Sequence, residues 1–196
     1  MAPLWWAALA AGLVYLGVVA SGRRGPVRAV KVLPALLLAG WLGPTHPIAA
    51  GGMLVSAAGD AFLLDKDRFF LAGLGAFLVA HLLFVPAFLG ASGATPSGAF
   101  VASLLVFAGG MLAVIRPKKP VLQVAVPLYA LVLCAMAAAA STLGPLGWLG
   151  GLSFLVSDGV LSIRVFRREF PGADLIVMVT YYGALLALSL ALAAPP

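Results

Sequence analysis

Long apolar runs alternate with short clusters of charged residues along the whole chain. A helix that crosses the hydrocarbon core of a bilayer needs about 20 mostly apolar residues, with a range of about 17–25. Glycine and proline occupy the gaps between the runs, as expected of connecting loops. We therefore expect an all-α membrane protein, one transmembrane domain built as a bundle of eight transmembrane helices. The predicted spans, of which the second is the shortest, are residues 3–20, 29–43, 47–64, 69–89, 97–115, 120–140, 146–163 and 175–194.

The basic residues fall in alternate loops of this pattern. All twelve lie at the connections between spans 1 and 2, 3 and 4, 5 and 6, or 7 and 8. Loops rich in lysine and arginine stay on the cytoplasmic side of a membrane. The pattern thus predicts an integral, multi-pass protein of a bacterial plasma membrane, with both termini outside and its polar site in the cytoplasmic half.

The composition agrees with lipid as the solvent. Hydrophobic residues make up 63% of the chain and charged residues 9%, against about 45–50% and about 25% in soluble domains. The net charge of +6 is explained by the loops, so we expect no nucleic-acid partner. Cys134 has no second cysteine in the chain with which to form a disulfide, and we interpret it as a small buried hydrophobic residue. A catalytic zinc site usually has three protein ligands, and His46 is predicted on the opposite side of the membrane from the candidate site. An Asp-Asp-His site is the remaining, disfavoured alternative, and we expect neither a metal nor a cofactor.

An internal repeat is visible in the spacing of polar residues. Glycine pairs precede Asp60 in span 3 and Asp158 in span 7, and these aspartates are 98 residues apart, half the chain. Lys31 lies 29 residues before Asp60, and Tyr129 lies 29 residues before Asp158. Two parallel four-helix repeats would produce this spacing, because an even number of helices preserves direction. Chance in a chain rich in alanine, leucine and glycine is the alternative.

Asp60 and Asp158 are the acidic residues inside the predicted spans. An acid in hydrocarbon costs about 2.5–3.5 kcal/mol on insertion scales and faces the bundle interior. By helical rise, both lie roughly 8–9 Å inside the cytoplasmic boundary. We expect them to share a cavity in which one carboxyl is protonated and the other charged, which supplies a general acid and a general base. A structural hydrogen bond between helices is the alternative role.

Other polar side chains are candidates for binding or orienting a substrate beside this pair. Lys31, at the cytoplasmic edge of span 2, could hold a phosphate or serve only as a topology residue. The remaining candidates have structural alternatives of the same kind, as helix-contact or interfacial residues. They are Ser56, His81, Tyr129, Ser157, Tyr181 and Tyr182.

Six short motifs, in order, cover about residues 30–190: Lys31-Val-Leu-Pro34, Ser56-Ala-Ala-Gly-Asp60, Phe77-Leu-Val-Ala-His81-Leu-Leu, Pro127-Leu-Tyr129, Leu155-Val-Ser-Asp158-Gly-Val-Leu161 and Val179-Thr-Tyr-Tyr182. With these motifs the chain resembles the YhhN-like family of membrane proteins, which includes the lysoplasmalogenases. The resemblance implies cleavage of the vinyl ether of a lysoplasmalogen, a 1-alkenyl glycerophosphoethanolamine or glycerophosphocholine. The products would be a fatty aldehyde and a glycerophospho-alcohol, with Asp60 and Asp158 as the central pair.

The implied chemistry agrees with the residues. Protonation of a vinyl ether at its β-carbon gives an oxocarbenium ion, to which water adds, so an acid and a carboxylate suffice. We expect a lysophospholipid substrate and membrane lipids as partners, and the oligomeric state stays open, a homodimer included. A small proton-coupled transporter or lipid carrier is the alternative function, because buried carboxylates and parallel repeats suit it as well. An intramembrane aspartyl protease is disfavoured, since Ala57-Ala-Gly-Asp60 lacks the first glycine of a Gly-x-Gly-Asp motif.

Overall fold

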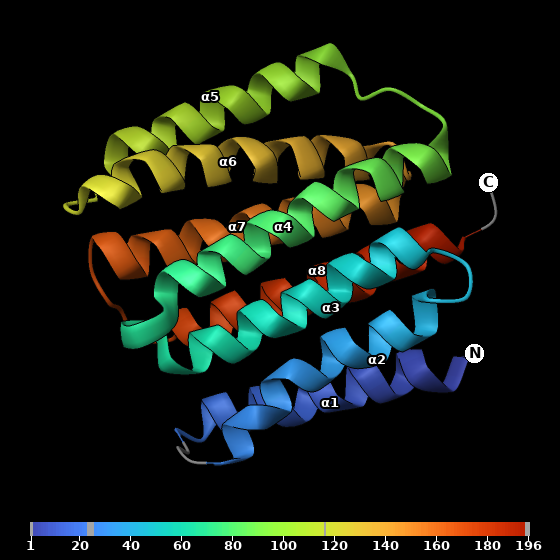
Figure 1. Cartoon of the computed structure of the whole chain (residues 1–196), viewed down its shortest axis with the longest axis horizontal. Coiled ribbons are helices and arrows are strands. Elements are labelled where there is room, and N and C mark those ends of the chain that lie inside the picture. Colours follow the sequence, from blue (N-terminus) through green and yellow to red (C-terminus); the bar gives the residue numbers. More distant parts are fainter. Residues whose placement is uncertain (1, 23–25, 116, 195–196) are drawn as a thin grey trace.

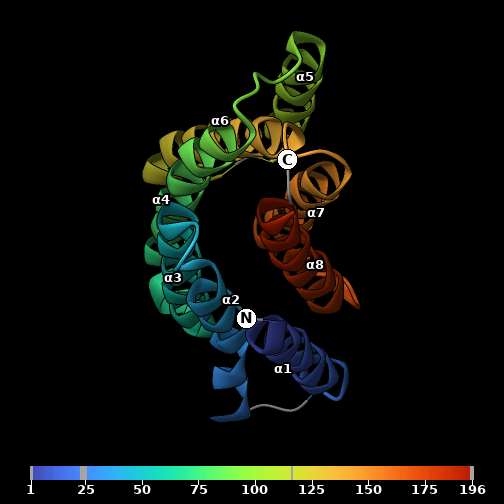
Figure 2. The same ribbon diagram turned by 90° about the vertical axis from the view of Figure 1, so that its right-hand side faces the viewer.

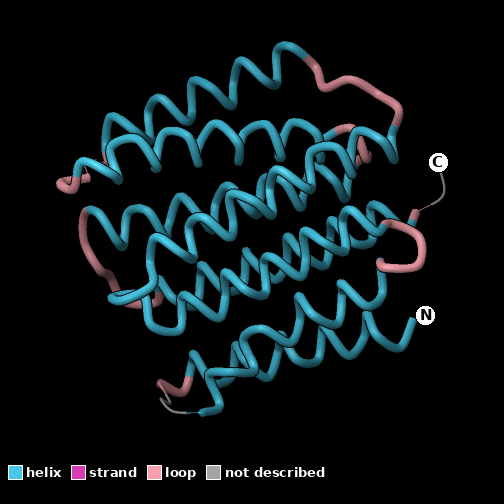
Figure 3. The backbone as a smooth tube through the Cα atoms, viewed as in Figure 1, coloured by secondary structure: helices cyan, strands magenta, loops and turns pink. Residues whose placement is uncertain are grey.

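The described part of the chain, residues 2–22, 26–115 and 117–194 of a computed structural model, folds into helices and the loops between them and contains no strand. Figure 1 and Figure 3 show the helices running side by side in alternating directions, joined by short loops. The prediction of an all-α bundle of eight helices is confirmed. The helices are α1 (Ala2–Ala20), α2 (Leu33–Leu42), α3 (Pro47–Phe62), α4 (Lys66–Ser92), α5 (Gly98–Val114), α6 (Pro120–Ser141), α7 (Pro145–Phe166) and α8 (Ala173–Ala193), with two short 3-10 helices, η1 (Pro26–Val32) and η2 (Leu63–Asp65).

Six of these helices, α1, α3, α4, α6, α7 and α8, are long and apolar enough to cross a membrane. The protein is therefore an integral, multi-pass membrane protein. The other two, α2 and α5, are shorter apolar helices.

The second predicted span does not form one regular α-helix. Its first residues belong to η1, and α2 begins only at Leu33, with Pro34 in its first turn. Proline lacks a backbone N–H and is tolerated where an α-helix starts, which explains why the α-helical pattern begins there. A 3-10 helix rises about 2.0 Å per residue, so η1 and α2 together reach at most about 29 Å, close to the hydrocarbon thickness of about 30 Å.

Viewed from the end of the bundle, α1, α2, α3, α4 and α6 follow one another around a curve, and α7 and α8 lie on its inner side (Figure 2). The most buried of the membrane-length helices is α8, which packs against α7, α1 and α2. At the periphery, α5 packs mainly against α6. The α3–α4 and α7–α8 connections lie at the end of the bundle opposite the two termini (Figure 1).

Glycines bring two helix pairs into close contact. A Cβ atom at Gly52 would lie 2.5 Å from a ring carbon of Phe84, between α3 and α4. A Cβ atom at Gly150 would lie 2.5 Å from Cγ of Leu188, between α7 and α8. Both glycines stand eight residues before an aspartate, so equivalent close contacts position Asp60 and Asp158 in the two halves.

Candidate active site

A cavity of about 690 Å³ lies inside the bundle. Its wall combines side chains from α1, α3, α4, α6, α7 and α8. Asp60 and Asp158 both line it, together with Lys31, Tyr129, Ser157 and Tyr181. The wall continues to Asp65, Arg164, Glu169 and Asp174, near the α3–α4 and α7–α8 connections. The two aspartates thus share one cavity that extends to the loop end of the bundle.

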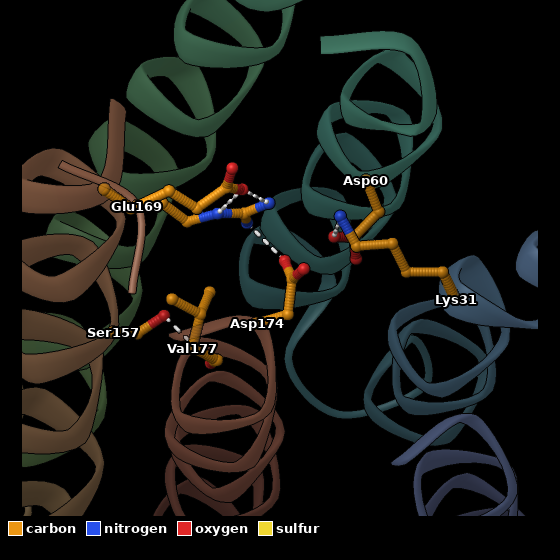
Figure 4. A network of polar contacts seen from close by, with 7 residues as sticks. Lys31, Asp60, Ser157, Glu169, Asp174 and Val177 are labelled. Atoms are coloured by element: carbon orange, nitrogen blue, oxygen red, sulfur yellow. Dashed lines mark hydrogen bonds and ion pairs between the residues drawn. The ribbon is translucent and has the colours of Figure 1, made fainter. Parts of the chain in front are cut away.

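Asp60 on α3 is held by a cation and a phenol. The ammonium Nζ of Lys31 lies 3.1 Å from its Oδ1, and the Tyr181 hydroxyl donates a hydrogen bond of 2.7 Å to its Oδ2. The side chains of Lys31 and Asp60 are only 10% and 2% exposed, so this is a buried ion pair (Figure 4). It ties η1 and α8 to α3.

Asp158 on α7 has different partners. The Tyr129 hydroxyl donates a hydrogen bond of 2.5 Å to its Oδ2. Nε2 of His81 lies 3.1 Å from the same hydroxyl and 3.9 Å from Oδ2 of Asp158. The Asp158 side chain is 14% exposed, more than that of Asp60, so it is the more accessible carboxyl.

The partners of the two aspartates are related across the halves of the chain. Each aspartate is contacted by a residue 29 positions earlier in its own half, Lys31 or Tyr129. Each is also approached by a residue of the last helix of the other half, Tyr181 on α8 or His81 on α4. The charges of these partners differ between the halves, because a lysine faces one aspartate and a tyrosine the other.

Three predicted residues lie behind the cavity wall rather than on it. His81 is fully buried, with its ring edge-on to Phe154 at a centroid distance of 4.9 Å. The Tyr182 hydroxyl donates a hydrogen bond of 3.0 Å to the backbone carbonyl of Lys31. Ser56 is fully buried. Within the described residues, neither its hydroxyl nor Nδ1 of His81 has a hydrogen-bond partner.

Ser157 and Lys31 have contacts that the sequence did not predict. The Ser157 hydroxyl donates a hydrogen bond of 3.1 Å to the Val177 carbonyl and so joins α7 to α8 beside the cavity (Figure 4). Lys31 was predicted at the cytoplasmic edge of span 2, as a phosphate holder or as a topology residue. Its ammonium lies against Asp60, a contact that the sequence did not indicate.

The polar residues where the cavity meets the loops were not predicted from the sequence. Arg164, Glu169 and Asp174 form a cluster of ion pairs there. In the sequence, Arg164 counts only among the basic residues of the loops, and the two acids drew no prediction. The available signal was the position of Arg164 directly after the predicted span that carries Asp158, six residues beyond that aspartate.

The arrangement offers proton chemistry in a partly enclosed site. Among the described residues, no three histidine, cysteine, aspartate or glutamate side chains come together in a group that could hold a metal ion. Two carboxyls with different partners, two tyrosine hydroxyls and a lysine do line one cavity. Such a set can donate a proton to a bound molecule and oppose the positive charge that results.

Comparison with known proteins identifies the family. The model of the YhhN family matches residues 26–192. The human lysoplasmalogenase TMEM86B is 37% identical over 170 residues, which cover 82% of this chain and 73% of the human protein. The lysoplasmalogenase of Mycobacterium bovis is 35% identical over 187 residues, covering 82% and 71%. No solved structure matches the chain. With most of its length matched by the family model and by these relatives, the chain belongs to the YhhN family.

Proposed function

We propose that this protein is a lysoplasmalogenase, which hydrolyses the vinyl ether bond of a lysophospholipid to a fatty aldehyde and a glycerophospho-alcohol. Relatives at 31–37% identity over most of the chain carry that name. The observation that carries the proposal is the shared cavity, which two carboxyls with unlike partners line inside a membrane-spanning bundle. A lysolipid of this kind has one hydrocarbon chain and one headgroup, which suits a cavity that runs from the apolar bundle to its polar end.

Asp158 is assigned as the general acid. Its side chain is the more accessible of the two, and no lysine or arginine of the described residues forms an ion pair with it. The electron pair of the vinyl double bond takes the proton of Asp158 and forms the new C–H bond at the β-carbon. This step leaves an oxocarbenium ion at the neighbouring carbon and a carboxylate on Asp158.

Asp60 is assigned as the charged partner. Its Oδ1 lies 3.1 Å from the ammonium of Lys31, and the Tyr181 hydrogen bond fixes the carboxylate in place. That fixed negative charge opposes the positive charge of the oxocarbenium ion. Water then attacks this ion and gives its proton to the Asp158 carboxylate, which regenerates the acid. The hemiacetal collapses to aldehyde and alcohol.

Tyr129 and His81 are assigned as positioning residues. The Tyr129 hydroxyl occupies Oδ2 of Asp158 and leaves Oδ1 to carry the proton. His81, held edge-on by Phe154, fixes the Tyr129 hydroxyl from the other side. This chain of contacts keeps the acid in one orientation, the condition for efficient proton transfer.

The orientation in the membrane follows from the basic loops. The polar end of the cavity lies beside the α3–α4 and α7–α8 connections, which carry lysine and arginine. By the positive-inside rule this end faces the cytoplasm and both termini face outside. Substrate would then enter from the cytoplasmic leaflet.

The test is product formation by purified protein in detergent. A lysoplasmalogen should be converted to fatty aldehyde and glycerophospho-alcohol, measured by mass spectrometry, while the saturated alkyl-ether analogue stays intact because it has no double bond to protonate. Detergent also separates this function from transport, since a transporter needs a sealed membrane and consumes nothing. An intact lysoplasmalogen after incubation with folded protein would contradict the proposal.

A further inference from the structure

Helices α1 and α8 lie next to each other and run in opposite directions (Figure 1, Figure 2). Near the two termini they are in direct contact. Nε1 of Trp5 donates a hydrogen bond of 3.2 Å to Oγ of Ser189. A Cβ atom at Gly12 would lie 3.4 Å from the ring of Tyr182, and the Tyr15 ring lies edge-on to the same ring at a centroid distance of 6.1 Å. These contacts join the two helices from the termini to the level of Tyr15.

Nearer the loop end of the bundle, hollows separate α1 from α8. Val18 and Val19 of α1 and Val177 and Met178 of α8 line the main cavity. Val19 also lines a second hollow of about 590 Å³, together with Leu175 of α8 and the α7–α8 connection. Val19 is half-buried and Leu175 is exposed, so the second hollow lies toward the outside of the bundle. These five apolar side chains define a path from the main cavity to the outer surface, which we call the α1–α8 groove.

The main cavity is closed on the side of the termini. The ring of Tyr181 lies edge-on to those of Phe77 and Phe154, at centroid distances of 5.8 Å and 5.5 Å. Phe154 is fully buried and stands four residues before Asp158 on α7, about one helical turn nearer the termini. Phe84, also fully buried, fills the space behind this layer of rings. A molecule whose reacting carbon lies at Asp158 therefore cannot extend further in this direction.

The other walls of the cavity are packed as well. Between α4, α6 and α7, buried Val126 belongs to an apolar cluster with Phe70 and Phe166, whose rings lie 6.0 Å apart. Between α7 and α8, the Ser157 hydroxyl is bonded to the Val177 carbonyl. Between α1 and α3, the 3-10 helix η1 packs against both helices. For the part of the chain that the structure describes, these contacts favour the α1–α8 groove as the sideways path out of the cavity.

The length of a lipid chain requires such a path. An extended chain of about 16 carbons is roughly 17 Å long, at about 3.5 Å for every three bonds. Asp158 and Arg164, at the loop end of the cavity, are six residues apart on α7, which is about 9 Å along the helix axis. The headgroup needs part of this space too. A long alkenyl chain therefore does not fit between the acid and the loop end and must leave the cavity sideways.

We propose that the α1–α8 groove is the hydrocarbon-chain site of this enzyme, and that the alkenyl chain of a lysophospholipid passes through it into the surrounding lipid. Valine, leucine and methionine line this path, so the chain stays in apolar surroundings from the cavity to the bilayer. The vinyl group reaches Asp158 while the rest of the chain remains in the membrane. This inference rests on the proposed function and adds to it the path by which the lipid reaches the acid.

The experiment compares two vinyl-ether lysolipids with the same headgroup, one with a hexadecenyl and one with a butenyl chain. The butenyl chain, about 3.5 Å long, fits inside the main cavity. Val19→Trp narrows the groove and should lower kcat/KM for the hexadecenyl lipid about tenfold or more, with the butenyl lipid changed less than about twofold. Val14→Trp is the matched control, because that side chain is 57% exposed and lines neither hollow. It should leave both values unchanged.

A reversible modification keeps the test open if Val19→Trp does not fold. Val19→Cys in a Cys134→Ala background is purified in the folded state and treated with hexyl methanethiosulfonate. Cleavage of the hexadecenyl lipid should fall about tenfold and return when a reductant removes the hexyl group, whereas Val14→Cys treated in the same way should not change.

Three results separate the chain site from the proposed function. Unchanged cleavage of the hexadecenyl lipid after complete modification at position 19 would overturn the chain site. An equal loss for the butenyl and hexadecenyl lipids would also overturn it, because the modification would then act on the cavity and not on the path of the chain. Failure of the wild type to cleave either lipid would instead overturn the proposed function.

Discussion

Lys31 and Asp60 form an ion pair in the interior of the bundle, whereas Asp158 is held by neutral or weakly basic groups. This difference separates two residues that look equivalent in the sequence. Removing one partner of a buried ion pair leaves an uncompensated charge and costs about 3–5 kcal/mol. Among the described residues, no lysine or arginine forms an ion pair with Asp158. Removing the charge of Asp158 therefore leaves no such cation unpaired.

Both Asp60→Asn and Asp158→Asn should lose at least about 100-fold in turnover, the contribution typical of a positioned acid or base. Only Asp60→Asn should also lower the thermal unfolding midpoint strongly in detergent, because Lys31 is left buried and unpaired. Adding Lys31→Met to Asp60→Asn should restore much of the midpoint and none of the activity. Near-wild-type turnover of Asp158→Asn would remove it from the mechanism.

Asp60 and Asp158 stood out in the sequence as candidates. The one structural role that explains an acidic residue within an apolar run is a contact between helices. Arg164 did not stand out, since a basic residue at the end of a span is what membrane topology alone requires. The pairing of Lys31 with Asp60 was also hidden, because spacing along the chain does not say which helices meet. The spacing of 29 residues did mark both Lys31 and Tyr129, and each contacts the aspartate that follows it.

The helix α7 carries Asp158, and its position depends on the close contact with α8 at Gly150. A Cβ atom there would meet the side chain of Leu188 at 2.5 Å and its backbone nitrogen at 3.2 Å. Overpacking of this kind costs about 1–3 kcal/mol. The contact therefore affects both the stability of the protein and the position of Asp158.

Gly150→Ala should lower the unfolding midpoint and reduce turnover, because α7 must move away from α8 and take Asp158 with it. Gly109 on α5 is the matched control, since a Cβ atom there meets nothing within 4 Å. Gly109→Ala should lose neither stability nor activity. Equal behaviour of the two variants in thermal unfolding and aldehyde release would show that the α7–α8 contact is not tight.

Helix positions followed from the lengths of the apolar runs, and most predicted spans differ from the helices only at their ends. The exception is the 3-10 helix η1, which apolar content does not distinguish from an α-helix. Its cause, Pro34 in the first turn of α2, is visible in the sequence, but the choice between a 3-10 turn and a loop before it depends on packing against α1 and α3.

At the scale of the whole molecule, the bundle has one basic end, and the polar end of the cavity lies there. The alternation of basic loops predicted this end from the sequence. Which helices surround the cavity could not be predicted, because apolar spans carry little information on their neighbours.

Single cysteines placed in a Cys134→Ala background test the orientation. A cysteine at position 46, in the α2–α3 connection, should react with a membrane-impermeant maleimide on intact cells. A cysteine at position 118, in the α5–α6 connection, should react only after the membrane is opened. Labelling of both positions on intact cells would contradict the predicted orientation. The side of the membrane that the cavity faces would then be undetermined.

The central claim is that the carboxyl pair protonates a carbon and does not attack an acyl group. The most direct measurement offers purified protein an equal mixture of a vinyl-ether lysolipid and the ester lysolipid of the same headgroup and chain length, with Asp158→Asn as the blank. The account predicts that fatty aldehyde appears, that free fatty acid stays at the level of the blank, and that the aldehyde signal disappears in the variant. Rapid release of fatty acid with the vinyl ether left intact would contradict it.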